Sequence, residues 1–219
     1  MYIVQLLKQI PITRRIILKI KERKFLKLNS YENMSNGIVN IDYNDKCRSN
    51  KIVIGKECRL DLPTIRIRGS HNTIIIEDGV YMGKQCSFWM EGDGINIVIG
   101  KNTSFTRLCH FCAQENDVSI IVGEDCMFSN KIIVRTSDSH PIYDLNTKER
   151  LNPAKSVKIG SRVWIAPDSK IMKGAEIGDG SIVGSNTMIS KTYPSNCLIV
   201  GMPGRIVKEN IYWTREALF

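Results

Sequence analysis

The sequence predicts an all-β protein built as a parallel β-helix, on three observations. Aliphatic residues recur every six positions without a gap at Ile159, Ile165, Ile171, Ile177, Val183 and Ile189. A small residue follows four positions after each of the first five. The same unit occurs earlier, where its leading residues stand 22, 23 and 23 positions apart at Ile54, Ile76, Ile99 and Val122. Helices need a period near 3.6 and sandwiches a two-residue alternation broken by hairpin turns, so neither class fits.

A six-residue period follows from the geometry of a short strand and a turn. A strand sends alternate side chains to opposite faces, so one large aliphatic residue per unit points inward. The turn after it needs a small residue, because the backbone corner crowds the interior. Three units make a triangular coil of about 18 residues, and such coils stack about 4.8 Å apart like strands in a sheet. The earlier spacing of 22 or 23 residues is then one coil with a bulge at a corner.

Several of the seven cysteines are predicted to be structural thiols. Cys58 and Cys126 occupy the small interior position of the repeat, which Ser, Thr, Ala and Val fill elsewhere. An odd number of cysteines in a chain without a secretion signal argues against a disulfide framework. Cys109 and Cys112 form a lone pair, with no second pair and no histidine at zinc spacing. We therefore predict no metal site.

The repeat is interrupted between Val134 and Ile159. We expect an extruded loop over residues 135–156, and long excursions from a regular scaffold often carry functional sites. This loop contains His140, which the following proline biases toward an extended backbone. The predicted organisation is a β-helix domain over residues 31–209 that includes this loop as its candidate functional site, followed by a C-terminal tail over residues 210–219.

Residues 1–30 form a basic N-terminal segment, with eight Lys and Arg residues against the single acid Glu22. The whole chain has a formal net charge of +9, so most of the excess lies in this segment. Such a segment suits an anionic polymer or a membrane surface, and the alternative is a solvated basic arm. No nucleic-acid-binding motif accompanies it, and no nucleic acid partner is expected. Without a spanning apolar run or a secretion signal, the expected location is the cytoplasm, with peripheral contact at the inner membrane face as an extension.

The hexads over about residues 50–209 resemble the hexapeptide-repeat acyltransferase family, whose fold is a left-handed parallel β-helix. The handedness comes from this resemblance, because the general rule for parallel crossovers favours right-handed ones. A resemblance to the galactoside and maltose acetyltransferase branch rests on residues 139–142, 157–160, 163–165 and 200–207. A closer resemblance, to the polysialic acid O-acetyltransferases that modify bacterial capsules, rests on residues 140–143, 149–150, 163–164 and 206–213.

The resemblance implies direct acetyl transfer from acetyl-CoA to a saccharide hydroxyl, without an acyl-enzyme intermediate. It favours a sialic acid polymer as the acceptor. His140 is the expected general base, because imidazole exchanges a proton near neutral pH. Asp138 or a loop carbonyl would orient its ring. Trp164 is expected to flank the site as an aromatic wall for a sugar, with packing at a subunit contact as the alternative. His110 is expected to be incidental to the site, and His71 to lie on the surface.

The resemblance also places a CoA site on the last coils. Its expected residues are Ala166, Ser185, Ser190, Lys191, Arg205 and Lys208. The branch usually has Gly at position 166 and Ala at position 185, so this chain adds bulk at both. A homotrimer with active sites between subunits is implied, because one prism offers flat faces and no deep cleft. The basic segment and a short C-terminal helix, from about Val207 to Ala217, are expected to cover the ends of the β-helix.

Three alternatives remain open. A zinc carbonic anhydrase of the γ type uses this fold, but it needs closely spaced histidines, and the three here stand 39 and 30 positions apart. A non-catalytic β-helix binding module is the second, and failure to bind CoA would favour it. The third is a different acceptor: another capsule or O-antigen saccharide, or a small free sugar or antibiotic.

Overall fold

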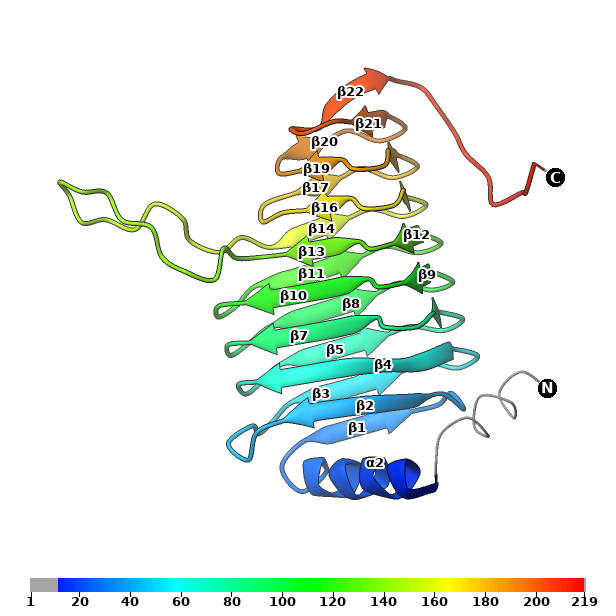
Figure 1. Cartoon of the computed structure of the whole chain (residues 1–219), viewed down its shortest axis with the longest axis vertical. Helices are drawn as coiled ribbons and strands as arrows, with labels where there is room; N and C mark the ends of the chain where they lie inside the picture. The colour runs from blue at the N-terminus through cyan, green and yellow to red at the C-terminus, as the bar shows by residue number, and fades with distance from the viewer. Residues whose placement is uncertain (1–11, 219) are drawn as a thin grey trace.

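The computed structural model describes residues 12–218, which form a three-sided parallel β-helix with a long loop on one side (Figure 1). The first face contains β1 (Ser30–Asn33), β3 (Lys51–Ile54), β5 (Thr73–Ile76), β8 (Asn96–Ile99), β11 (Ser119–Val122), β14 (Val157–Ile159), β17 (Glu176–Ile177) and β20 (Thr192–Tyr193). The second contains β2 (Ile38–Tyr43), β4 (Arg59–Arg68), β7 (Ser87–Glu91), β10 (His110–Gln114), β13 (Ile133–Arg135), β16 (Lys170–Ile171) and β19 (Met188–Ile189). The third continues from β4 through β6 (Tyr81–Met82), β9 (Ser104–Arg107), β12 (Met127–Asn130), β15 (Trp164–Ile165), β18 (Ile182–Val183), β21 (Leu198–Val200) and β22 (Arg205–Lys208).

The interior is the stacked column of inward residues that the six-residue period predicts. The aliphatic residues of the uninterrupted register are all buried, and so are the small residues that follow them. Where the small interior residue is polar, its side chain forms hydrogen bonds with the backbone of the next coil. For example, the Ser169 hydroxyl donates to the Gly184 carbonyl at 2.8 Å. Four phenylalanine rings fill the middle of the column, with contacting centroids 4.7–5.7 Å apart: Phe88, Phe105, Phe111 and Phe128.

The two cysteines that the repeat placed in the interior lie there. Cys58 and Cys126 are buried in the interior, as predicted, and burial raises the pKa of both thiols. All seven cysteines are free, and only Cys112 among them is partly exposed. Across residues 12–218 no group of three or more His, Cys, Asp or Glu side chains has an arrangement that could hold a metal ion.

The N-terminal end of the β-helix is covered by α2 (Ile12–Phe25), which lies across the first coils in Figure 1. Phe25 is completely buried, and its ring meets that of Tyr43 edge to face at 5.1 Å. The Tyr43 hydroxyl donates to the carbonyl of Lys21 at 3.2 Å. Residues 1–11 of the predicted basic segment lie outside the described residues. No helix within residues 12–218 has the length and apolarity to cross a bilayer.

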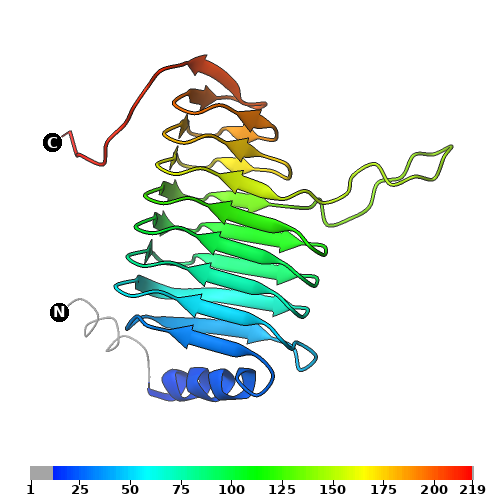
Figure 2. The ribbon, with the colours of Figure 1, turned by 180° about the vertical axis from the view of Figure 1, so that it is seen from behind.

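The C-terminal helix expected from Val207 to Ala217 is wrong. The strand β22 pairs antiparallel with β21, and an extended tail then runs back along the coils, on the side away from the long loop (Figure 2). The Trp213 indole donates to the Arg162 carbonyl at 2.8 Å, and Arg215 contacts Asp125 at 2.7 Å. These contacts to the coils outweigh the local preference for a helix.

Candidate active site

The histidine loop leaves the β-helix after β13 and rejoins it at β14, at the corner between the second and first faces. It projects well beyond the coils in Figures 1 and 2. Its outer part is an antiparallel turn in which Tyr143 bridges Arg150. The Asp144 carboxylate caps this turn by accepting the N–H groups of Asn146 and Thr147, both at 2.8 Å. His140 lies near the base of the loop and is exposed.

Asn152 fixes the backbone around His140. Its side-chain nitrogen donates to the His140 carbonyl at 3.0 Å and to Asp138 at 2.9 Å. Its side-chain oxygen accepts the N–H of Ile142 at 2.7 Å. Asn152 is only 7% exposed, so these bonds are largely shielded from water. The amide therefore ties together both strands of the loop at the position of the histidine.

Asp138 does not orient the imidazole in this arrangement. Its carboxylate is held by the Lys173 ammonium at 2.6 Å and by Asn152. The bond to Lys173 lowers the pKa of Asp138 below its usual value. Within residues 12–218, the only hydrogen bond at His140 is made by its backbone carbonyl. Asp138 therefore anchors the loop to the next coil and leaves the ring free for other partners.

Arg150 and Glu115 fasten the loop to the coil beneath it. The guanidinium makes two parallel bonds to the carboxylate, at 2.6 and 2.7 Å. Ser137 also donates to Glu115, at 2.6 Å. The bond from Arg150 is the main reason that the pKa of Glu115 falls from 4.5 to about 2. A shallow hollow lies under this part of the loop, lined by Glu115, Asn116, Val118, Pro153 and Ala154.

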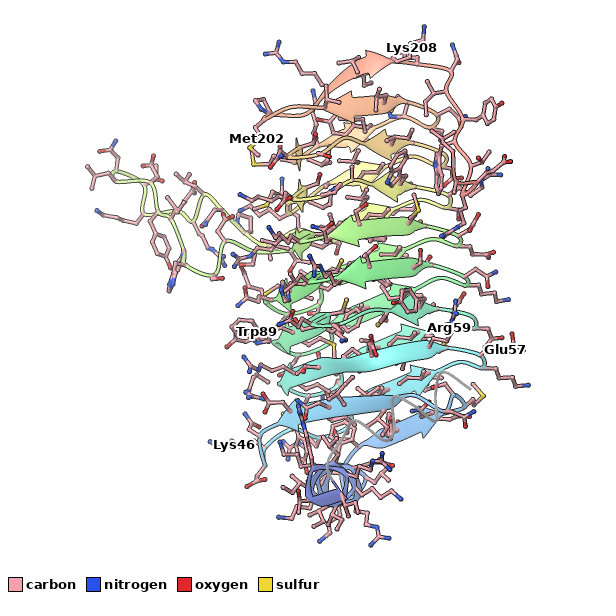
Figure 3. The ribbon with its side chains drawn as sticks, turned by 45° about the vertical axis from the view of Figure 1, so that its right-hand side comes forward. Lys46, Glu57, Arg59, Trp89, Met202 and Lys208 are labelled. Atoms are coloured by element: carbon pink, nitrogen blue, oxygen red, sulfur yellow. The ribbon has the colours of Figure 1, made fainter. Side chains whose placement is uncertain are left out.

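A row of cationic and aromatic side chains runs along the outside of the second face toward the loop. Arg66, Trp89, Cys112 and Arg135 stand in register on successive strands. The Arg66 guanidinium stacks over the Trp89 ring at 5.4 Å, and Trp89 is exposed. Figure 3 shows Trp89 at the edge from which the loop projects. We call Arg66, Trp89 and Arg135 the cationic–aromatic row.

Arg135 connects this row to the loop. Its guanidinium donates to the Ser139 hydroxyl at 2.6 Å and to the Gln114 side chain at 3.3 Å. Gln114 in turn donates to Glu91 at 2.8 Å. The residue before His140 is therefore held by the second face, although the sequence shows Arg135 and Gln114 only as outward strand positions.

One chain does not bring His140 and Trp164 together. Trp164 begins β15 on the third face, whose outer corner lies opposite the loop in Figure 1. Its ring packs at 6.1 Å from that of Trp213. Its indole N–H is buried without a hydrogen-bond partner among the described residues.

The other two histidines lie apart from His140. His71 lies on the surface, as expected, and His110 shares a 2.8 Å hydrogen bond with Ser87 on the second face. Burial lowers the pKa of His110.

The six residues expected at a CoA site lie on the last coils but not in one group. Ala166 is nearly buried after β15, and Ser185 follows β18 one coil further on. Ser190 and Lys191 follow β19 at another corner, where the Lys191 ammonium lies over the Tyr193 ring at 5.5 Å. Arg205 and Lys208 are exposed at the ends of β22, the terminal strand (Figure 3).

Comparisons with known proteins identify the family to which this β-helix of hexad coils belongs. The family described as "Bacterial transferase hexapeptide (six repeats)" matches residues 156–191. The polysialic acid O-acetyltransferase of Neisseria meningitidis is 36% identical over 170 residues, which cover 77% of each chain. That of Escherichia coli O1:K1 is 40% identical over 91 residues, covering 42% of this chain and 30% of the relative.

Two solved structures match most of the chain. The polysialic-acid-specific acetyltransferase NeuO superposes with a TM-score of 0.71 and 27% identity, covering 88% of this chain and 92% of that one. The polysialic acid O-acetyltransferase OatWY gives 0.71 and 30%, covering 86% and 92%. The chain belongs to the polysialic acid O-acetyltransferase family of hexapeptide-repeat transferases. The predicted left-handed β-helix and the predicted acetyltransferase class are thereby confirmed.

Proposed function

We propose that this protein transfers an acetyl group from acetyl-CoA to a hydroxyl of an anionic bacterial surface polysaccharide, with a sialic acid polymer as the favoured acceptor. The observation that carries the proposal is the sequence similarity to the Neisseria meningitidis enzyme, which covers 77% of both chains. Two solved structures of polysialic acid O-acetyltransferases match the fold with a TM-score of 0.71. The exposed Trp89 indole of the cationic–aromatic row also supports it, because an indole suits the face of a sugar ring. Arg66 is paired with Asp42 at 2.8 Å and Arg135 is bonded to Ser139, so these guanidinium groups would offer an acidic saccharide their remaining N–H groups.

The chemistry proposed for the site needs one base. His140 removes the proton from the acceptor hydroxyl as its oxygen attacks the thioester carbonyl, and the tetrahedral adduct then expels the CoA thiolate. The imidazolium returns the proton to that thiolate, so ester and free CoA leave and the histidine ends neutral. Asn152 holds the His140 backbone at 3.0 Å, which supports a fixed starting point for the ring. No metal takes part in this scheme.

We propose a homotrimer in which each active site draws on two subunits. The histidine loop leaves the corner between the second and first faces, whereas Trp164 begins β15 on the third face. The loop projects past its own coils (Figure 1). A neighbouring subunit would bring its third face, with Trp164 at the start of β15, against the loop. The CoA residues proposed to bind the pantetheine arm and phosphates are Ala166, Ser185, Ser190, Lys191, Arg205 and Lys208. The expected place of work is the cytoplasm, where peripheral contact with the inner membrane face would bring the enzyme near polysaccharide assembly.

CoA release from acetyl-CoA, measured against a panel of acceptors, tests the function. The panel holds oligosialic acid, neutral oligosaccharides and free sugars, and the variants are His140→Ala and, as a matched control, His71→Asn. Asparagine suits the left-handed backbone of position 71, where φ is 60°. We expect turnover with oligosialic acid, a loss of 100-fold or more (about 10²–10⁴-fold) in His140→Ala, and no loss in the control. Turnover only with free sugars would mean that the acceptor is a small sugar and not the proposed polysaccharide. Failure to bind CoA would favour a non-catalytic binding module.

Subunit mixing tests the shared site. His140→Ala and Trp164→Ala chains are each expected to be inactive alone, and together they can rebuild sites that take an intact residue from each chain. A rebuilt site needs its loop from a Trp164→Ala chain and its tryptophan from a neighbouring His140→Ala chain. In an equal mixture each condition is met about half of the time, so random assembly should restore about a quarter of the wild-type activity. No recovery on mixing, although light scattering shows mixed trimers, would contradict a site between subunits.

A further inference from the structure

The side of α2 that faces away from the β-helix is apolar. Ile12, Ile16 and Ile20 recur at four-residue spacing and so lie along one side of the helix, with Ile17 beside them. These four side chains are between 49% and 75% exposed. The opposite side docks on the coils through Phe25 and Leu18. The helix therefore has apolar side chains on two sides, and among residues 12–218 only those on the docked side pack against the coils.

The same helix is strongly basic. It carries six Lys and Arg residues against the single acid Glu22. Arg23 and Lys24 are exposed and flank the isoleucines. Lys19 is also exposed and borders the hollow between the helix and the coils, in which Glu22 is half-buried. The outer side of α2 thus combines exposed isoleucines with positive charge, which is the composition of helices that lie in the interface of an anionic bilayer. We call Ile12, Ile16, Ile17 and Ile20, together with Lys19, Arg23 and Lys24, the α2 outer surface.

We propose that the α2 outer surface docks this protein on membranes containing anionic phospholipid. The isoleucines insert at the boundary of headgroups and acyl chains, and the lysine and arginine side chains bind lipid phosphates. An anionic polysaccharide would satisfy the charges but would leave the isoleucines in water. A second copy of the same surface would cover the isoleucines but would oppose like charges. A bilayer surface with negative headgroups satisfies both features.

This mode of docking also sets the orientation of the molecule. The helix lies across the end of the β-helix, so the stack of coils would rise from the membrane (Figure 1). On the first face, five steps lead from β1 to β14, where the histidine loop rejoins. At about 4.8 Å per step, the loop would stand roughly 24 Å above the first coil. The inference does not depend on the proposed acetyl transfer, because it rests on a different part of the chain.

Vesicle co-sedimentation of the full chain tests the proposal. The vesicles are phosphatidylcholine alone, or phosphatidylcholine mixed with phosphatidylglycerol. The variants are Ile16→Ser/Ile20→Ser and Lys19→Gln/Arg23→Gln. The control, Leu145→Ser/Leu218→Ser, removes side chains that are 82% and 101% exposed elsewhere. Circular dichroism should show unchanged thermal unfolding in all of them, because every substituted side chain faces solvent.

We expect binding only to the mixed vesicles, weakened roughly 5-fold per isoleucine removed and roughly 5-fold per charge removed. The control should bind like the wild type. Absence of binding, equal loss in the control, or a serine variant that binds fully would each overturn the proposal, the last by indicating a purely electrostatic partner. A lower mass of the serine variant in light scattering would also overturn it, by assigning the surface to a second copy. CoA release is not part of this test, so its outcome is distinct from that of the proposed function.

Discussion

Replacing Asn152 with alanine should release the histidine loop without unfolding the β-helix. The substitution removes three hydrogen bonds, to the Ile142 N–H, the His140 carbonyl and Asp138, at 2.7, 3.0 and 2.9 Å. A net contribution of about 1 kcal/mol per bond gives about 3 kcal/mol, since Asn152 is nearly buried and its partners lose their shielded bonds. The open loop should then be populated on the order of 100-fold more. The core lies elsewhere, so the melting temperature should change by only a few degrees.

Two measurements follow this release. Chymotrypsin should cut after Tyr143 or Leu145, which are 57% and 82% exposed at the outer turn, and the cleavage rate reports the open population. In the CoA-release assay, kcat should fall by up to about 100-fold while KM for acetyl-CoA stays the same, because only the position of the imidazole has changed. Asn146→Ala is the matched control, since this exposed asparagine lies on the same loop.

Three results would refute this reasoning. If Asn152→Ala is cleaved much faster but retains full kcat, the seating of the loop does not matter for the chemistry, and His140 loses its role as a positioned base. If cleavage is unchanged, the ion pair between Arg150 and Glu115 holds the loop without help from Asn152. A large fall in the melting temperature would mean that the loop and the coils unfold together.

Three further results are expected. The folded chain depresses the pKa of Glu115 from 4.5 to about 2, so its stabilisation of the loop should be complete above pH 4.5 and lost as the pH falls toward about 2. Amide hydrogen exchange in the loop should therefore become faster in acid. Phe128→Ala, in the middle of the phenylalanine column, should cost about 3–5 kcal/mol and lower the melting temperature by roughly 10 °C, whereas Phe128→Leu should cost less. Ellman's reagent should react with one thiol of the native chain, Cys112, and with all seven after unfolding; several fast thiols in the native chain would contradict the burial.

Much of the fold could be predicted from the sequence because a β-helix repeats its local rule. The six-residue period identified the inward residues from Ile159 to Ile189, and all of them are buried. The C-terminal helix failed for a physical reason. The preference of residues 207–217 for a helix is a local property, whereas their contacts are with residues far away in the chain, such as Arg162 and Asp125. Such contacts leave no periodic pattern in the sequence.

The candidate site was only partly accessible from the sequence. The break in the register located the loop, and with it His140. The residues that hold the loop were missed, because each acts across a wide gap in sequence: Arg150 binds Glu115, 35 positions away, and Lys173 binds Asp138, also 35 away. The stacking of coils decides these pairs. The period gives the stacking within the regular coils but not where an extruded segment comes back.

The loop restraint and the shared site can be tested together, because they predict an effect that depends on which subunit carries the substitution. In a mixture of His140→Ala and Trp164→Ala chains, a rebuilt site takes its histidine loop from the Trp164→Ala chain. Asn152→Ala placed in that chain should lower the recovered activity by up to about 100-fold, because the working loop loses its bonds. The same substitution in the His140→Ala chain should leave the recovered activity unchanged, because the loop of that chain lacks His140 and contributes only to inactive sites. Equal losses from both placements would mean that Asn152 acts on assembly and not on the position of the base.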